Sequence, residues 1–173
     1  MNTRKIVMTG MFISLGVVLP IAFHSFNMGG SVFLPMHIPV LMAGLTLGPL
    51  AGLFTGVLTP ILSSLMTGMP PMFPMLPIMV FELGVYGLTS GYIAKQMPGR
   101  TYFPLIAGMI DGRVMAAIVV FVLATFFGVQ MSPWAFLKGA IVTGIPGILI
   151  QLVIIPPLVK AIRNATGLKA DHA

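Results

Sequence analysis

Apolar segments of about the length needed to cross a lipid bilayer fill most of this 173-residue chain. A transmembrane helix needs about 20 predominantly apolar residues, and glycine and proline residues divide the sequence into six candidate segments. They lie at residues 5–23, 36–48, 50–67, 72–94, 102–128 and 133–160. The second of these is short for a full crossing. We therefore predict an all-α integral membrane protein, in which residues 1–173 form a single domain built as one bundle of six transmembrane helices.

The composition supports this prediction. Hydrophobic residues make up 57% of the chain and charged residues only 7%, whereas soluble domains carry roughly 25% charged residues. The chain has no cysteine, which excludes disulfides and thiolate metal sites. Its net charge of +6 comes from cations placed in ones and twos beside apolar segments, a pattern typical of membrane topology. We expect no nucleic-acid partner.

The positions of the cations predict the orientation in the membrane. Lysine and arginine gather beside three segment ends: Arg4 and Lys5, then Lys95 and Arg100, then Lys160, Arg163 and Lys169. With six crossings all three groups fall on one side, which the positive-inside rule places in the cytoplasm. Both termini are therefore expected in the cytoplasm. The loops around residues 24–35, 67–72 and 129–132 contain no lysine or arginine and are expected outside.

Three charged residues, Glu82, Asp111 and Arg113, lie within predicted spans. A rise of about 1.5 Å per residue from the shared turn places Glu82 and Arg113 at nearly the same depth. A charge near the bilayer centre costs at least about 2.5 kcal/mol, so such residues should face the bundle interior. Asp111 and Arg113 are two residues apart and do not face each other. Two interpretations stay open: a structural Glu82–Arg113 ion pair, or contact between at least one of these groups and a polar substrate.

Other polar residues are candidates for ligand contact. Lys138 lies about 7 Å into the sixth segment, where it can extend to the headgroups or bind an anionic ligand. Tyr86 follows Glu82 by four residues and shares its helix face. His37 and Asn27 belong to the first outer loop. His37 and His24 lack a third metal ligand nearby, so we expect no metal site.

Small residues repeat at every fourth position in several segments, a spacing that lets helices approach closely. The repeats are Gly44, Gly48, Gly52 and Gly56, then Gly87 and Gly91, and in the first segment Gly10 and Ser14. Packing within the bundle is the simplest interpretation. The alternative is a docking face for another membrane subunit, which the first helix is best placed to carry.

The whole chain resembles the substrate-binding S components of energy-coupling factor transporters, small six-helix membrane proteins that capture vitamins for bacterial cells. The resemblance is carried by "TRKIVMTGMFISLGVVLP", "LPMHIPVLMAGLTLGPLAGLFTGVLTPILSSLMTG" and "MVFELGVYGLTSGYIAK". It implies a multi-pass protein of the bacterial cell membrane that is not an enzyme. It further implies a vitamin pocket open to the outside, a transmembrane coupling subunit and two cytoplasmic ATPase subunits. The chain itself would need no cofactor, because the partners use the ATP.

The resemblance also suggests which residues serve which role. The implied substrate-binding residues, with Tyr86 added from its position beside Glu82, are Asn27, His37, Thr67, Glu82, Tyr86, Arg113 and Lys138. Gly10 and Ser14 match the small-residue pair with which many family members dock the coupling subunit. Two cations suit a ligand with a carboxylate and hydroxyls, so pantothenate is the best candidate. A flavin is less favoured, and a pyridoxine-like or niacin-like ligand stays open.

Two other classes of function compete with this one. A self-sufficient small secondary transporter or channel needs polar residues along both halves of the membrane, but the inner halves are mostly apolar, with Gln151 the main exception. An intramembrane hydrolase needs a serine beside a histidine base. Ser90 lies near the cytoplasmic end, far from His24 and His37. Copurification with a coupling subunit and ATPases would distinguish an S component from both alternatives.

Overall fold

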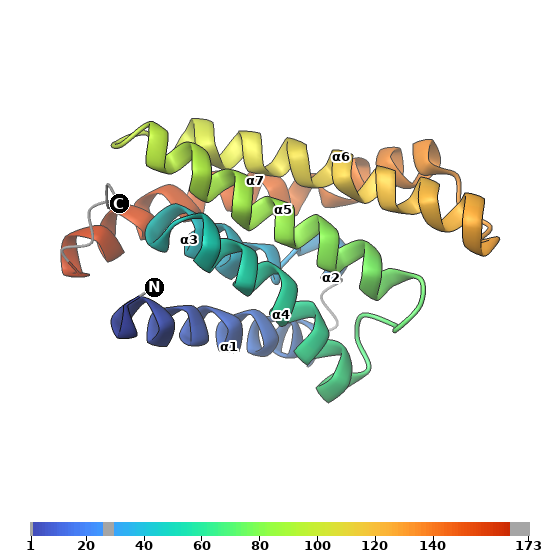
Figure 1. The fold of residues 1–173 in the computed structure, drawn as a ribbon, viewed down its shortest axis with the longest axis horizontal. Helices are drawn as coiled ribbons and strands as arrows, with labels where there is room; N and C mark the ends of the chain where they lie inside the picture. Colours follow the sequence, from blue (N-terminus) through green and yellow to red (C-terminus); the bar gives the residue numbers. More distant parts are fainter. Residues whose placement is uncertain (1, 26–29, 167–173) are drawn as a thin grey trace.

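The computed structural model describes residues 2–25 and 30–166, and all the regular secondary structure in this part of the chain is helical. The helices, shown in Figure 1, are α1 (Thr3–Ser25), α2 (Gly30–Phe33), α3 (His37–Leu47), α4 (Pro49–Thr67), α5 (Met75–Gln96), α6 (Tyr102–Phe127) and α7 (Pro133–Thr166). Five of them, α1, α4, α5, α6 and α7, are long and apolar enough to cross a membrane. The predicted all-helical fold is confirmed. The sixth crossing stays a prediction, because α3 has only 11 residues.

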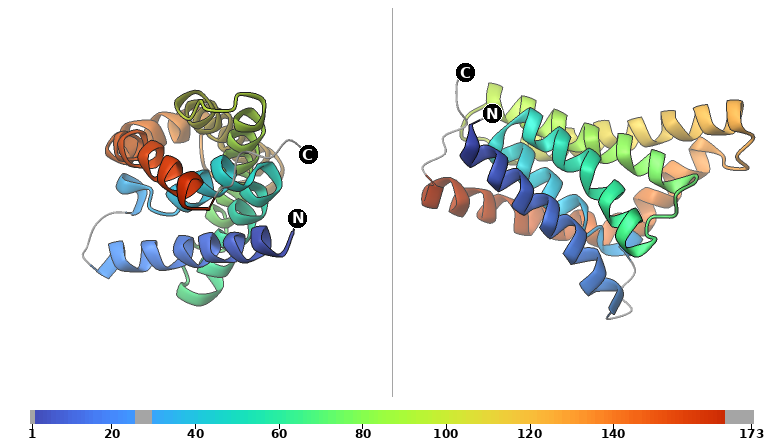
Figure 2. Two further views of the ribbon diagram at one scale, coloured as in Figure 1. Left: turned by 90° about the vertical axis from the view of Figure 1, so that its left-hand side faces the viewer. Right: turned by 60° about the horizontal axis from the view of Figure 1, so that its bottom comes forward.

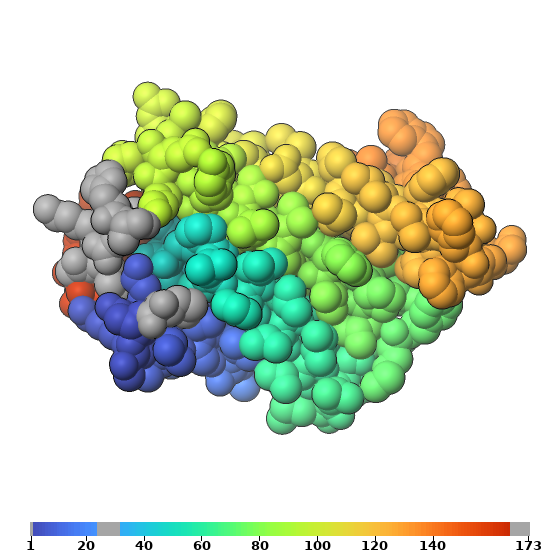
Figure 3. Space-filling view, in the orientation of Figure 1, coloured from blue at the N-terminus to red at the C-terminus, as the bar shows by residue number. Residues whose placement is uncertain are grey.

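The helices form a bundle around α3. Helices α1, α4, α5 and α6 lie side by side across one face of the molecule (Figures 1 and 3). Helix α3 contacts α1, α4, α5 and α7, and every one of its residues except Ile38 is buried. Helix α7 packs against α2, α3 and α6 and changes direction along its length (Figure 2). It contains Pro146, Pro156 and Pro157, and proline is the usual cause of such bends.

Glycines bring α4 and α5 into backbone contact. A Cβ atom built on Gly52 would clash with the carbonyl of Gly87, and one on Gly56 would clash with the carbonyl of Leu83. The predicted packing role of these glycines is confirmed. Gly48 has a different role, because its φ of 103° forms the corner between α3 and α4 and a Cβ there would meet nothing within 4 Å. Only glycine adopts that backbone conformation readily.

Helix α3 fills one half of the bundle only. Eleven residues span about 16 Å, roughly half of the hydrocarbon thickness. Figure 1 shows α3 beside the start of α1 and the end of α7. Residues 34–36, which precede α3, are buried although they are not helical. Non-helical backbone at membrane depth is tolerated where it is buried in protein or lines a cavity. The other half of the bundle interior is therefore open to a cavity.

Six of the eight described lysine and arginine residues lie at one end of the bundle. The start of α1, the turn between α5 and α6, and the end of α7 are all found at the left of Figure 1. These three places carry Arg4 and Lys5, Lys95 and Arg100, and Lys160 and Arg163. Lys169 lies outside the described residues. The first and the last described helix therefore have their outer ends, the start of α1 and the end of α7, at the same end of the bundle.

Arg163 links the end of α7 to α3. Its Nη2 donates a hydrogen bond to the Leu45 carbonyl over 2.7 Å. The residue four positions after Leu45 is Pro49, which has no N–H, so this carbonyl lacks its helical donor. We expect Arg163→Ala to lower the free energy of unfolding by about 1.5–3 kcal/mol, as for other hydrogen bonds from charged groups. Thermal unfolding in detergent would measure this, with Lys160→Ala, at an exposed position one turn earlier, as the control. Equal effects of the two variants would contradict the assigned role.

Candidate functional site

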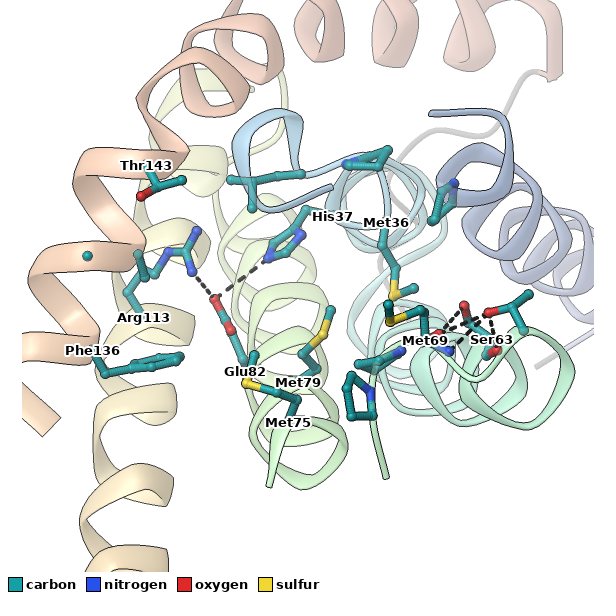
Figure 4. Close-up of a pocket in the computed structure, with 18 of the residues that line it drawn as sticks. Met36, His37, Ser63, Met69, Met75, Met79, Glu82, Arg113, Phe136 and Thr143 are labelled. Atoms are coloured by element: carbon teal, nitrogen blue, oxygen red, sulfur yellow. Dashed lines mark hydrogen bonds and ion pairs between the residues drawn. The ribbon is translucent and has the colours of Figure 1, made fainter. Parts of the chain in front are cut away.

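A cavity of about 1140 Å³, here called the central cavity, lies in the half of the bundle that α3 leaves open. Its floor carries His37, Glu82 and Arg113 (Figure 4). The lining residues also include Thr67 at the end of α4 and Ala135 at the start of α7, which form part of its rim. Ligand pockets in proteins usually measure about 300–1,000 Å³. The central cavity can therefore hold a small organic molecule with room to spare.

The floor of the cavity is an ionic cluster. Arg113 Nη1 donates to Glu82 Oε1 over 2.6 Å, and His37 Nε2 lies 3.6 Å from the same oxygen. The three residues come from α6, α5 and the first turn of α3, and only 9%, 3% and 3% of their surfaces are exposed, in that order. The Glu82–Arg113 ion pair, one of the two interpretations left open by the sequence, is present in the structure. The pair also lines the cavity, so the structural and the ligand-binding interpretations are compatible.

Several nitrogens of this cluster have no hydrogen-bond partner within the described part of the chain. They are Nε and Nη2 of Arg113 and both ring nitrogens of His37. Buried donors without partners cost free energy, most of all on a charged group. Glu82 occupies one corner of the guanidinium fork, which can bind a planar carboxylate through two N–H groups. Arg113 is thus able to accept a second anionic partner.

The walls above the floor are mainly apolar and flexible. Met36, Met69, Met75 and Met79 line the cavity, and Phe136 contributes the only phenyl or phenol ring among the described lining residues (Figure 4). Met75 and Met79 share one face of α5 with Glu82, since the three positions are spaced by four and three residues. Methionine side chains adapt their shape to irregular apolar surfaces. The walls therefore suit a flexible, largely aliphatic ligand body.

Hydroxyl groups at the end of α4 hold the loop that forms one wall. Ser63 Oγ donates to the Met69 carbonyl and Ser64 Oγ to the Pro70 carbonyl, each over 2.7 Å. Thr67 Oγ1 accepts a hydrogen bond from Met69 N over 3.2 Å. Met69 and Pro70 line the central cavity. Sequence analysis did not single out Ser63 and Ser64, although a run of hydroxyl residues before a proline-rich loop was a usable signal.

Removing one of these hydroxyls should loosen the wall. We expect Ser64→Ala to lower the free energy of unfolding by about 1–2 kcal/mol, because the buried Pro70 carbonyl loses its donor. Thr125→Ala is the matched control, since that exposed hydroxyl donates only to Phe121 within its own helix. Thermal unfolding of both variants in detergent measures the difference. A Ser64→Ala variant as stable as the wild type would show that the hydrogen bond from Ser64 to the Pro70 carbonyl does not stabilise the protein.

The structure brings four of the seven predicted substrate-binding residues to the cavity: His37, Thr67, Glu82 and Arg113. Tyr86 is not among the lining residues. It lies beneath the floor with 1% of its surface exposed, and its ring meets His37 edge-on at a centroid distance of 5.0 Å. Gly112 makes room for it, because a Cβ there would clash with the Tyr86 ring. Tyr86 thus supports the imidazole from below.

Three further polar positions singled out from the sequence do not contribute to the cavity in the described part of the chain. Lys138 is exposed and does not line the cavity, whereas Phe136, Ala140 and Thr143 do, at the spacing of one helix face. Asn27 lies outside the described residues. Asp111 is exposed on α6, and the described residues give it no hydrogen bond or ion pair. The two charges of the fifth predicted span therefore have different surroundings.

The predicted docking pair lies on an exposed face of α1. A Cβ on Gly10 would meet nothing within 4 Å, and Ser14 is exposed, with its hydroxyl bonded to the Gly10 carbonyl over 3.0 Å. The apolar side chains of Val7 and Met11 on this helix are exposed by 58% and 61%. This surface is free for contact with lipid or with another membrane helix.

The fold defines a multi-pass helical membrane protein with a cavity inside its bundle. The chain matches the family model described as "ECF transporter, substrate-specific component" over residues 4–159. It therefore belongs to this family of transporter substrate-binding subunits, as the sequence resemblance indicated. No curated protein and no solved structure matches the chain.

Proposed function

We propose that this chain captures a water-soluble vitamin at the outer side of a bacterial cell membrane and delivers it through a coupling subunit driven by two separate ATPase subunits. Pantothenate is the best candidate. In this proposal the chain acts as one membrane domain with six crossings and both termini in the cytoplasm. The observation that carries the proposal is the central cavity with Arg113 in its floor. Two nitrogens of the Arg113 side chain, Nε and Nη2, have no hydrogen-bond partner in the described part of the chain.

The chemistry of the cavity supports a flexible monocarboxylate. Pantothenate has a carboxylate, an amide and hydroxyls on an aliphatic backbone. Arg113 can bind the carboxylate, because a guanidinium in a low-dielectric site offsets part of the cost of desolvating an anion. The methionine walls suit the aliphatic part. A large flat ring system would find a single phenyl ring, Phe136, for stacking, which makes a flavin less favoured.

The direction of capture follows from the position of the cavity in the bundle. Its rim includes the exposed residues Thr67, Pro71 and Ala135, which lie at the end of α4, in the loop that follows it and at the start of α7. This is the end of the bundle opposite the six clustered basic residues. Positive residues gather on the cytoplasmic side of membrane proteins. The cavity would then face the outside, where a scarce vitamin is met.

The exposed face of α1 supports docking of the coupling subunit. Gly10 and Ser14 allow another helix to approach closely, as small residues do at helix interfaces in membranes. Because the partner subunits bind and hydrolyse ATP in this proposal, the chain needs no cofactor of its own. We expect Gly10→Leu to prevent copurification with the coupling subunit and the ATPases while leaving vitamin binding intact.

Thermal stabilisation of the purified protein in detergent tests vitamin capture. The panel is pantothenate, nicotinate, biotin, pyridoxine and riboflavin. A vitamin present at 100 times its Kd adds about 2.7 kcal/mol to the free energy of unfolding. We expect this effect for pantothenate in the wild type and in Lys138→Ala, whose altered position does not line the cavity. Stabilisation by none of the vitamins would reject the proposal. Uptake by vesicles that contain this chain alone would favour a self-sufficient transporter.

A further inference from the structure

The floor of the central cavity is charge-balanced before an anion arrives. Glu82 contributes one negative and Arg113 one positive charge, joined at 2.6 Å. His37 faces both, and the phenol of Tyr86 packs edge-on against its ring. The described lining residues from α1, α4 and α7 include no titratable side chain. The imidazole is 97% buried, since its exposure is 3%, and neither ring nitrogen has a hydrogen-bond partner in the described chain. Burial without a hydrogen-bond partner favours the neutral form of the imidazole, because the charged form loses its hydration.

A carboxylate that binds Arg113 would upset this balance. The floor would then hold two negative charges and one positive charge in a space largely closed to water. An uncompensated buried charge is strongly unfavourable, so the site needs one more positive charge or one fewer negative charge. Among the described lining residues, His37 is the side chain that can gain a positive charge near neutral pH.

The position of His37 fits this role. Its Nε2 lies 3.6 Å from Glu82 Oε1, within ion-pair distance once the ring is protonated. Glu82 could then pair with His37, while Arg113 keeps unpartnered nitrogens for the carboxylate of the ligand. One ion pair in the unliganded floor becomes two in the liganded floor, with a net charge of zero in both states.

We propose that the vitamin is a small monocarboxylate and that it binds together with one proton, which His37 takes from water. This inference rests on the proposed function, and it names the class of substrate and the group that balances its charge. His37 is a specificity-determining residue in this scheme, because it makes an anionic ligand compatible with a floor that already contains a carboxylate. An uncharged ligand would need no proton.

The linkage has a definite sign. The liganded protein holds one proton more than the unliganded protein, so binding weakens as the proton concentration falls. We expect the Kd for pantothenate to rise with pH, by up to about tenfold per pH unit, wherever the imidazole is neutral in the free protein and protonated in the complex. In His37→Gln, the Kd should be nearly constant with pH, and the wild-type Kd should approach that constant value once the pH is high enough to keep the liganded imidazole neutral.

Isothermal titration calorimetry of the full chain with pantothenate measures the proton directly. Titrations at one pH in buffers of different ionisation enthalpy give the number of protons taken up per ligand. We expect a value near one for the wild type and near zero for His37→Gln. Glu82→Gln should also give a value near zero, because the ligand carboxylate then replaces the lost charge. The uncharged alcohol analogue of pantothenate, with CH₂OH in place of the carboxylate, should bind more weakly and without a proton.

The possible outcomes separate this inference from the proposed function. Pantothenate or another monocarboxylate of the panel binding without proton uptake would overturn the inference and leave vitamin capture standing. Proton uptake that persists in His37→Gln would also overturn the inference. The inference would fail as well if only an uncharged vitamin of the panel binds. Binding of no vitamin would reject both proposals. If Glu82→Gln fails to fold, His37→Gln still decides, because it leaves the Glu82–Arg113 pair in place.

Discussion

Replacing Arg113 with methionine is expected to weaken pantothenate binding by at least about 100-fold, since truncating one partner of a buried charge pair costs several kcal/mol. The same change leaves Glu82 buried without its partner at 2.6 Å. Removing one member of a buried ion pair typically costs about 3–5 kcal/mol of stability. Thermal unfolding and calorimetry on the same preparation would record both effects.

A double variant separates the role of Arg113 in folding from its role in binding. In Glu82→Gln with Arg113→Met, no unpaired charge stays in the floor, so stability should recover most of the loss. Pantothenate binding should not recover, because the cation is still absent. Asp111→Asn is the control for a charge change on the same helix at an exposed position, and it should retain both properties. A double variant that binds pantothenate like the wild type would show that the ion pair serves the fold alone.

Gly52→Ala is expected to be one of the most damaging single-methyl changes in the bundle. The added Cβ would clash with the backbone carbonyl of Gly87, which cannot rotate away as a side chain can, so α4 and α5 must separate. Overpacking usually costs about 1–3 kcal/mol, and we expect at least the upper end of that range here. The measurement is the midpoint of thermal unfolding in detergent.

Gly10→Ala is the matched control for this change. Its Cβ would meet nothing within 4 Å, and alanine is the better helix former. This variant should be as stable as the wild type or slightly more stable. Equal unfolding temperatures for Gly52→Ala and Gly10→Ala would show that α4 and α5 are not in close backbone contact at Gly52.

Depth along the bundle was predictable from the sequence. Glu82 and Arg113 lie on consecutive helices joined by a short turn, so counting residues from that turn gave each a height above the same reference. The glycines at positions 52, 56 and 87 were predictable for a related reason. Gly52 and Gly56 on α4 are four residues apart, and so are Gly87 and Gly91 on α5, so each pair lies on one face of its helix and backbone contact between α4 and α5 follows.

Rotation about a helix axis was not predictable in the same way. Met79 and Tyr86 lie on either side of Glu82 along one face of α5, yet Met79 lines the cavity and Tyr86 lies beneath its floor. The cavity floor lies between these two residues because α3 begins there, at His37. The position of α3 relative to α5 depends on how the whole bundle packs. Lys138 likewise turns away from the cavity because the face of α7 with Phe136 was the one packed inward.

Contacts between distant parts of the chain were also out of reach. The hydrogen bond from Arg163 to the Leu45 carbonyl joins residues far apart in sequence. The sequence did indicate that the Leu45 carbonyl needs another donor, because Pro49 has no N–H to serve as its helical donor. Nothing in the sequence indicated which side chain would supply the replacement.

Determining the structure of the purified protein with pantothenate bound would test directly whether the central cavity is the vitamin site. We expect the carboxylate to lie against the Arg113 guanidinium, His37 to lie within hydrogen-bond distance of Glu82, and the aliphatic part to lie among Met36, Met75 and Met79. A ligand bound outside this cavity, or inside it without contact to Arg113, would contradict the proposed site.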